Sequence, residues 1–138
     1  MNAKEFLREI RNIDRQIDRE TEQAEHIRAR LEAGRRVMQP GSARGGKHDW
    51  TDTADKLMEL EQRINARVRT MVDMKQTALD MIDSVADKTC REVLFDYYIN
   101  GLTWAEVAER MCYDSRYVFR LHGKGLQQCD EFCNAKGL

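Results

Sequence analysis

The sequence predicts an all-α protein. A long, coiled-coil-like antiparallel helical hairpin over residues 1–86 is expected to precede a module of shorter helices over residues 87–138. Three observations support this class. The 138 residues include one proline, 34 % charged residues and 7 % aromatic residues, a composition typical of long helices with a modest core. Apolar residues recur at heptad spacing over two long stretches. After residue 87 the apolar pattern shortens and cap signals appear.

The first helix is expected over residues 3–38, because apolar side chains recur there in alternating steps of four and three. The seam skips only Glu20 and Gly34, and the residues between seam positions are mostly charged or amide side chains. At about 1.5 Å per residue, this helix would be roughly 50 Å long. Its seam comprises Phe6, Ile10, Ile13, Ile17, Ala24, Ile27, Leu31 and Met38.

A loop over residues 39–52 should follow, because Pro40 and three glycines break the helical pattern. The second helix is expected to be capped by Thr51 or Asp52 and to run to about residue 84. Two helices of matching length favour the hairpin, although both seams could instead pair with a second chain in a homodimer through this arm. The second seam comprises Leu57, Leu60, Ile64, Val68, Met71, Ala78, Ile82 and Val85.

The tip of this arm is locally basic. Residues 28–48 hold six Arg or Lys residues against the single acid Glu32, so the loop over residues 39–50 is either a phosphate-binding arm or a solvated connection. Trp50, beside His48, is expected to pack on the end of the arm. Four methionines of the second helix are expected to fill the core; they are Met58, Met71, Met74 and Met81.

The C-terminal module shows a series of cap signals. Asp87 can cap a helix that carries Cys90, Val93, Leu94 and Tyr98 and ends at Gly101. The stretch "TWAE" places Thr103 and Glu106 at capping-box spacing. The helix that follows would bury Trp104, Val107, Ala108 and Met111. The stretch "CYD" forms a turn, and Asp114 or Ser115 caps the last helix, which is expected to end near residue 134.

The last helix is expected to have one apolar side and one basic side. Its apolar side would carry Val118, Leu121, His122, Gly125 and Cys129, and segment 115–129 contains no Asp or Glu. A short helix, a tight turn and a helix with a basic front predict a helix-turn-helix whose front enters the DNA major groove. Arginine suits guanine, glutamine suits adenine and lysine suits phosphate; a solvated basic face is the alternative. The candidate DNA-binding residues are Ser115, Arg116, Tyr117, Arg120, Lys124 and Gln127.

Residues 93–126, "VLFDYYINGLTWAEVAERMCYDSRYVFRLHGKGL", resemble the helix-turn-helix of sigma-70 region 4. The shared pattern is a leucine, a tyrosine, Gly-Leu-Thr, Glu-Val-Ala, a turn and Val118. The segment is closer still to the phage-encoded, ArpU-like late-gene regulators, which also share Trp104 and the run from Tyr113 to His122. The match covers about a quarter of the chain.

This resemblance implies a transcription regulator of phage or prophage late genes that binds promoter or operator DNA, with RNA polymerase as a partner. It implies that Arg116, Tyr117, Arg120 and Lys124 face the DNA. The sequence departs from the family at Cys112, where the turn usually has glycine, and at Gly125, where the helix usually has alanine. Gly123 is a second glycine inside the helix. No promoter-melting region is recognisable, so an accessory regulator fits better than a complete sigma factor.

Other function classes find little support. No catalytic motif occurs, and the histidines His26 and His48 are isolated in sequence, so neither an enzyme nor a cofactor is expected. His122 should support the helix-turn-helix through a hydrogen bond. The cysteines form no CxxC pair and should be small buried residues; they are Cys90, Cys112, Cys129 and Cys133. Without a signal peptide or a long apolar run, a cytoplasmic protein with no membrane partner is expected. The alternatives are a small-terminase-like DNA-packaging component and a helical protein–protein adaptor.

Overall fold

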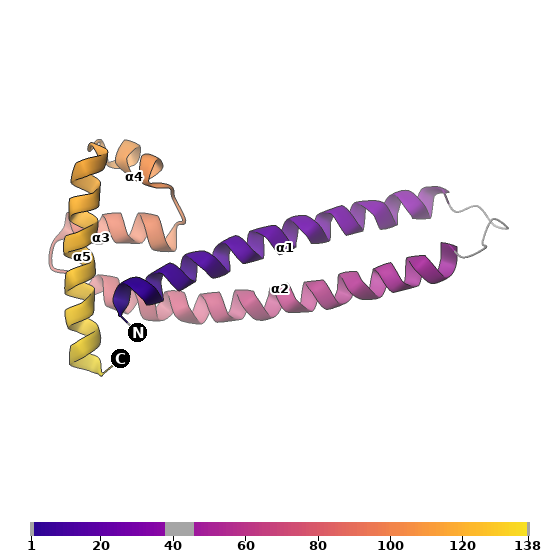
Figure 1. Ribbon diagram of the computed structural model, residues 1–138, viewed down its shortest axis with the longest axis horizontal. Coiled ribbons are helices and arrows are strands. Elements are labelled where there is room, and N and C mark those ends of the chain that lie inside the picture. Colours follow the sequence, from indigo (N-terminus) through magenta and orange to yellow (C-terminus); the bar gives the residue numbers. More distant parts are fainter. Residues whose placement is uncertain (1, 38–45, 138) are drawn as a thin grey trace. The chain divides into compact units, whose positions relative to one another are not determined.

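The computed structural model describes residues 2–37 and 46–137, and every regular element in these two ranges is helical (Figure 1). The all-α prediction is therefore confirmed. The two long helices are followed by three shorter ones and a π-helical segment. The elements are α1 (Ala3–Val37), α2 (Gly46–Asp83), α3 (Lys88–Leu94), η1 (Phe95–Ile99), α4 (Trp104–Met111) and α5 (Ser115–Lys136).

The predicted loop over residues 39–52 is wrong in its second half, because α2 begins at Gly46. Neither Thr51 nor Asp52 is therefore an N-cap. A glycine inside a helix costs only about 1 kcal/mol, whereas proline is a true stop, and the proline of this segment lies further back, at residue 40. The predicted phosphate-binding role of loop 39–50 rests mainly on residues 38–45, which lie outside the described residues.

Contacts group the chain into two compact units. Unit 1 comprises residues 1–14 and 71–138, and unit 2 comprises residues 15–70. The core of unit 1 joins the first turns of α1 to the end of α2 and to the shorter helices. Its largest fully buried side chains are Leu7, Ile10, Met81, Ile82, Val85, Cys90, Val93, Leu94, Val107, Val118 and Cys129.

The α1 seam within unit 1 differs from the predicted one. Ala3 and Leu7, which the heptad pattern omits, are fully buried beside Ile10, whereas the seam residues Phe6 and Ile13 are half-buried. The reason is that this part of α1 packs against several helices at once, so a wider stripe of α1 is covered than a two-helix seam would need.

In unit 2, α1 and α2 lie side by side and run in opposite directions. Glu20 pairs with Arg67 at 2.6 Å, and Arg28 pairs with Glu61 at 2.9 Å. Ala24 and Leu60 are the buried apolar residues of this unit in the described part of the chain. The remaining apolar positions of both seams in this unit are half-buried; they are Ile17, Ile27, Leu31, Leu57, Ile64 and Val68.

Two predictions about single side chains of α2 have different outcomes. The indole Nε1 of Trp50 donates to the Leu31 carbonyl at 3.4 Å, so Trp50 packs on the arm as expected. Met58, by contrast, is 61 % exposed, and the prediction that it fills the core is wrong. Met58 stands 13 residues before Met71, which places it on another side of α2 from Met71, Met74 and Met81. Of the four methionines, only Met81 is fully buried.

The segment before α4 contains a buried carboxylate, that of Asp96. Asp96 in η1 is 5 % exposed, and its Oδ1 accepts from Asn100 Nδ2 at 3.2 Å and pairs with Arg110 Nη1 at 3.2 Å. Gly101 follows with φ +72°, a left-handed conformation that glycine adopts without strain. The predicted helix end at Gly101 is confirmed, and Asp87 caps α3 as predicted, accepting from Thr89 N at 2.8 Å.

Candidate nucleic-acid interface

Helices α4 and α5 are joined by a turn that is fixed at both ends. Thr103 and Glu106 form the predicted capping box at the start of α4, with distances of 3.2 and 3.3 Å. Asp114 Oδ1 accepts from Tyr117 N at 2.8 Å, so Asp114 rather than Ser115 is the N-cap of α5. Between them, Cys112 adopts φ 59° and ψ 38°, the left-handed conformation that the sequence comparison with glycine-containing turns suggested.

The apolar side of α5 faces inward, as predicted. Val118, Leu121 and Cys129 are buried, and so are Leu126 and Cys133, which the sequence analysis left out. Gly125 faces α3, and a Cβ placed there would lie 2.7 Å from Leu94 Cδ1 and 3.0 Å from Leu94 Cγ. A side chain at this position would therefore push against Leu94 of α3, which is fully buried.

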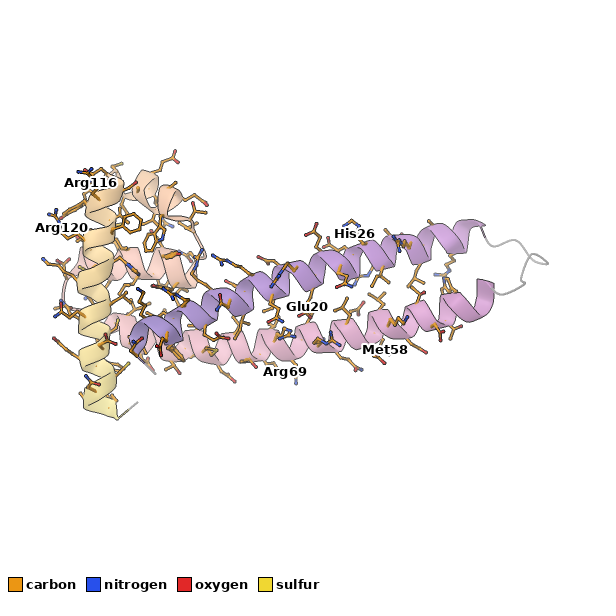
Figure 2. All side chains as sticks on the ribbon, in the orientation of Figure 1. Glu20, His26, Met58, Arg69, Arg116 and Arg120 are labelled. Atoms are coloured by element: carbon orange, nitrogen blue, oxygen red, sulfur yellow. The ribbon has the colours of Figure 1, made fainter. Side chains whose placement is uncertain are left out.

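The opposite side of α5 is exposed. Figure 2 shows Arg116 and Arg120 projecting outward from the first half of the helix. Lys124 and Gln127 continue the same face, with Ser115 at its start and Tyr117 at its edge, and all six side chains are exposed. Among the described residues, the three cations of this face form no ion pair. The structure thus exposes all six predicted side chains, and helical periodicity places Arg116, Arg120, Lys124 and Gln127 on one side of α5.

Aromatic side chains that the sequence analysis did not single out flank this face. Phe119 is 50 % exposed and packs on Trp104, with ring centroids 5.0 Å apart. Tyr113 lies edge-on to Tyr117 at 4.8 Å. Helical periodicity could have predicted the position of Phe119, because at 3.6 residues per turn Phe119 falls between the basic and apolar sides of α5.

His122 connects α5 to η1 and α4. Its Nε2 lies 2.7 Å from the hydroxyl of Tyr98, and its ring meets Trp104 edge-on at 4.6 Å. Burial, aided by the nearby charge of Lys4, lowers the pKa of His122 to about 4, and burial raises the pKa of Tyr98 to about 12. Both groups are therefore neutral near pH 7, and the predicted hydrogen-bonding role of His122 is confirmed.

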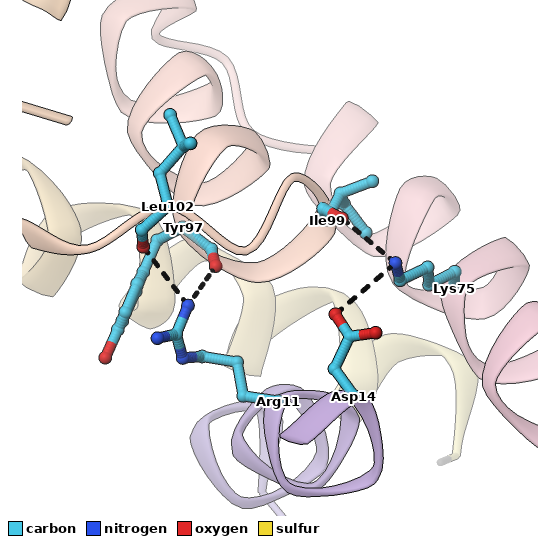
Figure 3. Close-up of polar contacts among 6 residues, drawn as sticks. All are labelled: Arg11, Asp14, Lys75, Tyr97, Ile99 and Leu102. Carbon is cyan, nitrogen blue, oxygen red and sulfur yellow. Dashed lines mark hydrogen bonds and ion pairs between the residues drawn. The ribbon is translucent and has the colours of Figure 1, made fainter. Parts of the chain in front are cut away.

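The segment that carries these aromatic residues is held by α1 and α2 (Figure 3). Arg11 Nη1 donates to the carbonyls of Tyr97 at 2.6 Å and Leu102 at 3.2 Å, and its guanidinium carbon lies 3.8 Å from the Tyr97 ring centroid. Lys75 Nζ donates to the Ile99 carbonyl at 3.0 Å and lies 3.7 Å from Asp14 Oδ2. Two cations thus satisfy the carbonyls at the end of η1.

Three of the four cysteines are buried and one is exposed. Burial raises the pKa of Cys129 to about 12, and Cys90 and Cys133 are also buried, as expected. Cys112, which ends α4 with a positive φ, is exposed, so the prediction of a buried side chain is wrong there. Across residues 2–37 and 46–137, no group of three or more His, Cys, Asp or Glu side chains could hold a metal ion.

No helix in the described ranges combines the length and the apolar character needed to cross a membrane. No family model matches the sequence, and neither the search of curated proteins nor that of solved structures returned a match. The geometry and charge of the exposed face of α5 therefore carry the functional argument.

Proposed function

We propose that this protein is a sequence-specific, DNA-binding transcription regulator of the sigma-70 region 4-like, ArpU-like class, acting on phage or prophage late genes. In this proposal α4 and α5 form a helix-turn-helix, and α1 and α2 form a long antiparallel hairpin that precedes it. The single observation that carries the proposal is the face of α5. It exposes Arg116, Arg120, Lys124 and Gln127 on a segment without carboxylates, while the other side of the same helix is buried.

The charge pattern fits DNA better than a merely solvated helix. The whole chain has a net charge of −1, so attraction to phosphate has to come from a local cluster. Solvated helices usually mix acids with bases one turn apart, as α1 does with Arg15 and Asp18, which are both exposed. Helix α5 has no acid from Ser115 to Cys129, which is what contact with a polyanion requires.

Each exposed side chain has a role in this proposal. Arg116 and Arg120 lie one turn apart at the N-terminal end of α5, which is the end that reaches base edges in helix-turn-helix proteins. Arginine can donate two hydrogen bonds to guanine O6 and N7, and Gln127 can read adenine. Lys124 contacts phosphate, and Ser115 and Tyr117 contact the backbone beside the groove.

The test begins with fragments selected for binding from the genome of origin. Arg120→Ala should weaken specific binding by about 1–3 kcal/mol, or about 5- to 150-fold, if Arg120 reads a base. Arg69→Ala is the matched control, because Arg69 is exposed in unit 2 and forms no ion pair among the described residues. A gel-shift titration that is unchanged by Arg120→Ala would reject the assigned role.

The arm is proposed to mediate homodimerisation, and RNA polymerase is proposed as a further partner. Among the described residues of unit 2, Ala24 and Leu60 are the only buried apolar side chains, so a second copy would cover the half-buried seam and add stability. Light scattering should give a dimer or a monomer for a regulator, whereas a closed ring would favour a small-terminase-like packaging component. Failure to bind any duplex at low salt would favour a protein–protein adaptor.

A further inference from the structure

The beginning of α1 is fixed beside α5. Ala3, Leu7 and Ile10 are fully buried in the core of unit 1. The Ala3 N–H donates to Asp130 Oδ1 of α5 at 2.8 Å, a contact between residues 127 positions apart in sequence, and Figure 1 shows the N-terminal end of α1 near α5. The first turns of α1 are therefore part of the body that carries the proposed DNA-binding face.

These turns present cations on one flank. With Ala3, Leu7 and Ile10 inward, Lys4 and Arg8 lie one turn apart on the same flank, and both are exposed. The next cation of this flank, Arg11, folds onto the carbonyls of Tyr97 and Leu102. The flank therefore faces the segment that supports α5, rather than the far side of the unit.

The electrostatics agree with this placement. The charge of Lys4 is close enough to contribute to the lowered pKa of His122, and the charge of Arg8 acts on Tyr98, the hydrogen-bond partner of His122. Neither Lys4 nor Arg8 forms an ion pair with any described carboxylate. Asp130, the nearest acid of α5 to Ala3, already accepts the Ala3 hydrogen bond.

Gly123 leaves one position beside the basic face of α5 without a side chain, and the half-exposed ring of Phe119 lies one turn before it. Around α5, Gly123 lies between His122 and Arg120, and a Cβ placed on Gly123 would meet no heavy atom within 4 Å. No side chain at this position stands between the flank of α1 and the basic face. A helix about 10–12 Å across fills a major groove about 12 Å wide, so cations on an element beside that helix meet the phosphates that border the groove.

We propose that Lys4 and Arg8 bind backbone phosphates of the same duplex whose major groove α5 enters, so that the DNA-binding surface is assembled from both ends of the chain. This inference rests on the proposed function. The ligand is double-stranded DNA. The contacts carry no sequence information, because phosphates are the same at every base pair.

The experiment compares the double variant Lys4→Gln/Arg8→Gln of the full chain with the control Lys56→Gln/Arg63→Gln, whose residues are exposed in unit 2. Binding to a genome-selected duplex and to an unrelated duplex is measured across a range of salt concentrations. The Lys4/Arg8 variant should bind both duplexes about 10- to 30-fold more weakly near physiological salt. Its plot of log K against log salt should be less steep by about 1.8, because each neutralised phosphate contributes about 0.9. The control should match the wild type.

The outcomes separate this inference from the proposed function. An unchanged salt slope for the Lys4/Arg8 variant, together with weakened binding of Arg120→Ala, overturns the inference and leaves the proposed function standing. Equal slope changes in the test and control variants also overturn it. Absence of DNA binding by the wild type overturns both. If the glutamine variant is destabilised, Lys4→Arg/Arg8→Lys keeps both charges and should keep the wild-type slope; loss of slope there shows that charge is not the cause.

Discussion

Two glycines of α5, two residues apart, should respond to alanine in opposite ways. Gly→Ala in a helix interior gains about 1 kcal/mol of helix propensity. At Gly123 the new Cβ meets no heavy atom within 4 Å, so Gly123→Ala should keep this gain. For a chain of 138 residues it should raise the Tm by about 3–5 °C.

At Gly125 the same gain is opposed by a clash. The new Cβ would lie 2.7, 3.0 and 3.5 Å from Leu94 Cδ1, Cγ and Cδ2, and Leu94 is fully buried and has no solvent to move into. Overpacking of this kind costs about 1–3 kcal/mol. Because the propensity gain is common to both variants, Gly125→Ala should be about 1–3 kcal/mol less stable than Gly123→Ala.

Urea unfolding of the full chain, followed by circular dichroism, measures both variants. A Leu94→Ala background removes the clash, so Gly125→Ala should become neutral or stabilising there, and the double-mutant cycle gives the coupling free energy. Leu94→Val serves the same purpose if Leu94→Ala does not fold. Equal stability of the two glycine variants in the wild-type background would refute the close approach of α3 to α5.

Three further predictions concern the support of the interface. Cys112→Gly should raise the free energy of unfolding by about 0.5–1 kcal/mol, because the left-handed backbone strains any residue with a side chain; unchanged urea unfolding would contradict this. Arg11→Ala should lower the free energy of unfolding by about 1–3 kcal/mol, because it leaves two carbonyls unpaired. A decrease in the free energy of unfolding of less than about 0.5 kcal/mol would show that water replaces the guanidinium. The pKa of His122 is lowered to about 4 by burial, so the unfolded chain binds the proton first as the pH falls. The stability that neutral His122 provides is complete above about pH 6.5 and is lost on the way to about pH 4, a change of about 1–2 kcal/mol after allowance for its partial exposure. His122→Gln should remove this part of the pH dependence, and an identical pH profile would count against it.

Features that depend on residues close in sequence, such as helix caps and the two sides of α5, could be predicted from the sequence. The caps at Asp87 and Thr103 depend on side chains and N–H groups within three residues of each other, so spacing identifies them, whereas for α5 it left Asp114 and Ser115 as alternatives. The two sides of α5 follow from helical periodicity, and their burial and exposure agree with it. The assignment of DNA to the exposed side stays a prediction.

Features that depend on contacts between distant parts of the chain could not be predicted from the sequence. The burial of Ala3 and Leu7 is set by helices more than 70 residues away, and no heptad pattern encodes that partner. Arg11 binds carbonyls, which every residue carries and no sequence motif marks. Helix α2 begins at Gly46 because a glycine lowers helix stability by only about 1 kcal/mol. Treating the glycines of this segment as helix breakers in the sequence analysis overstated this cost. Cys112 is exposed at the end of α4, where its φ is positive. An L-residue rarely adopts this conformation, so the residue type did not predict it.

Amide chemical shifts measure directly whether the acid-free side of α5 binds DNA. The ¹⁵N-labelled full chain is titrated with a duplex selected from the genome of origin, at low salt and again at high salt. The account predicts that the largest shifts fall on residues 115–127 and that they shrink as salt rises. Shifts confined to residues 15–70, or a spectrum that the duplex leaves unchanged at low salt, would contradict it.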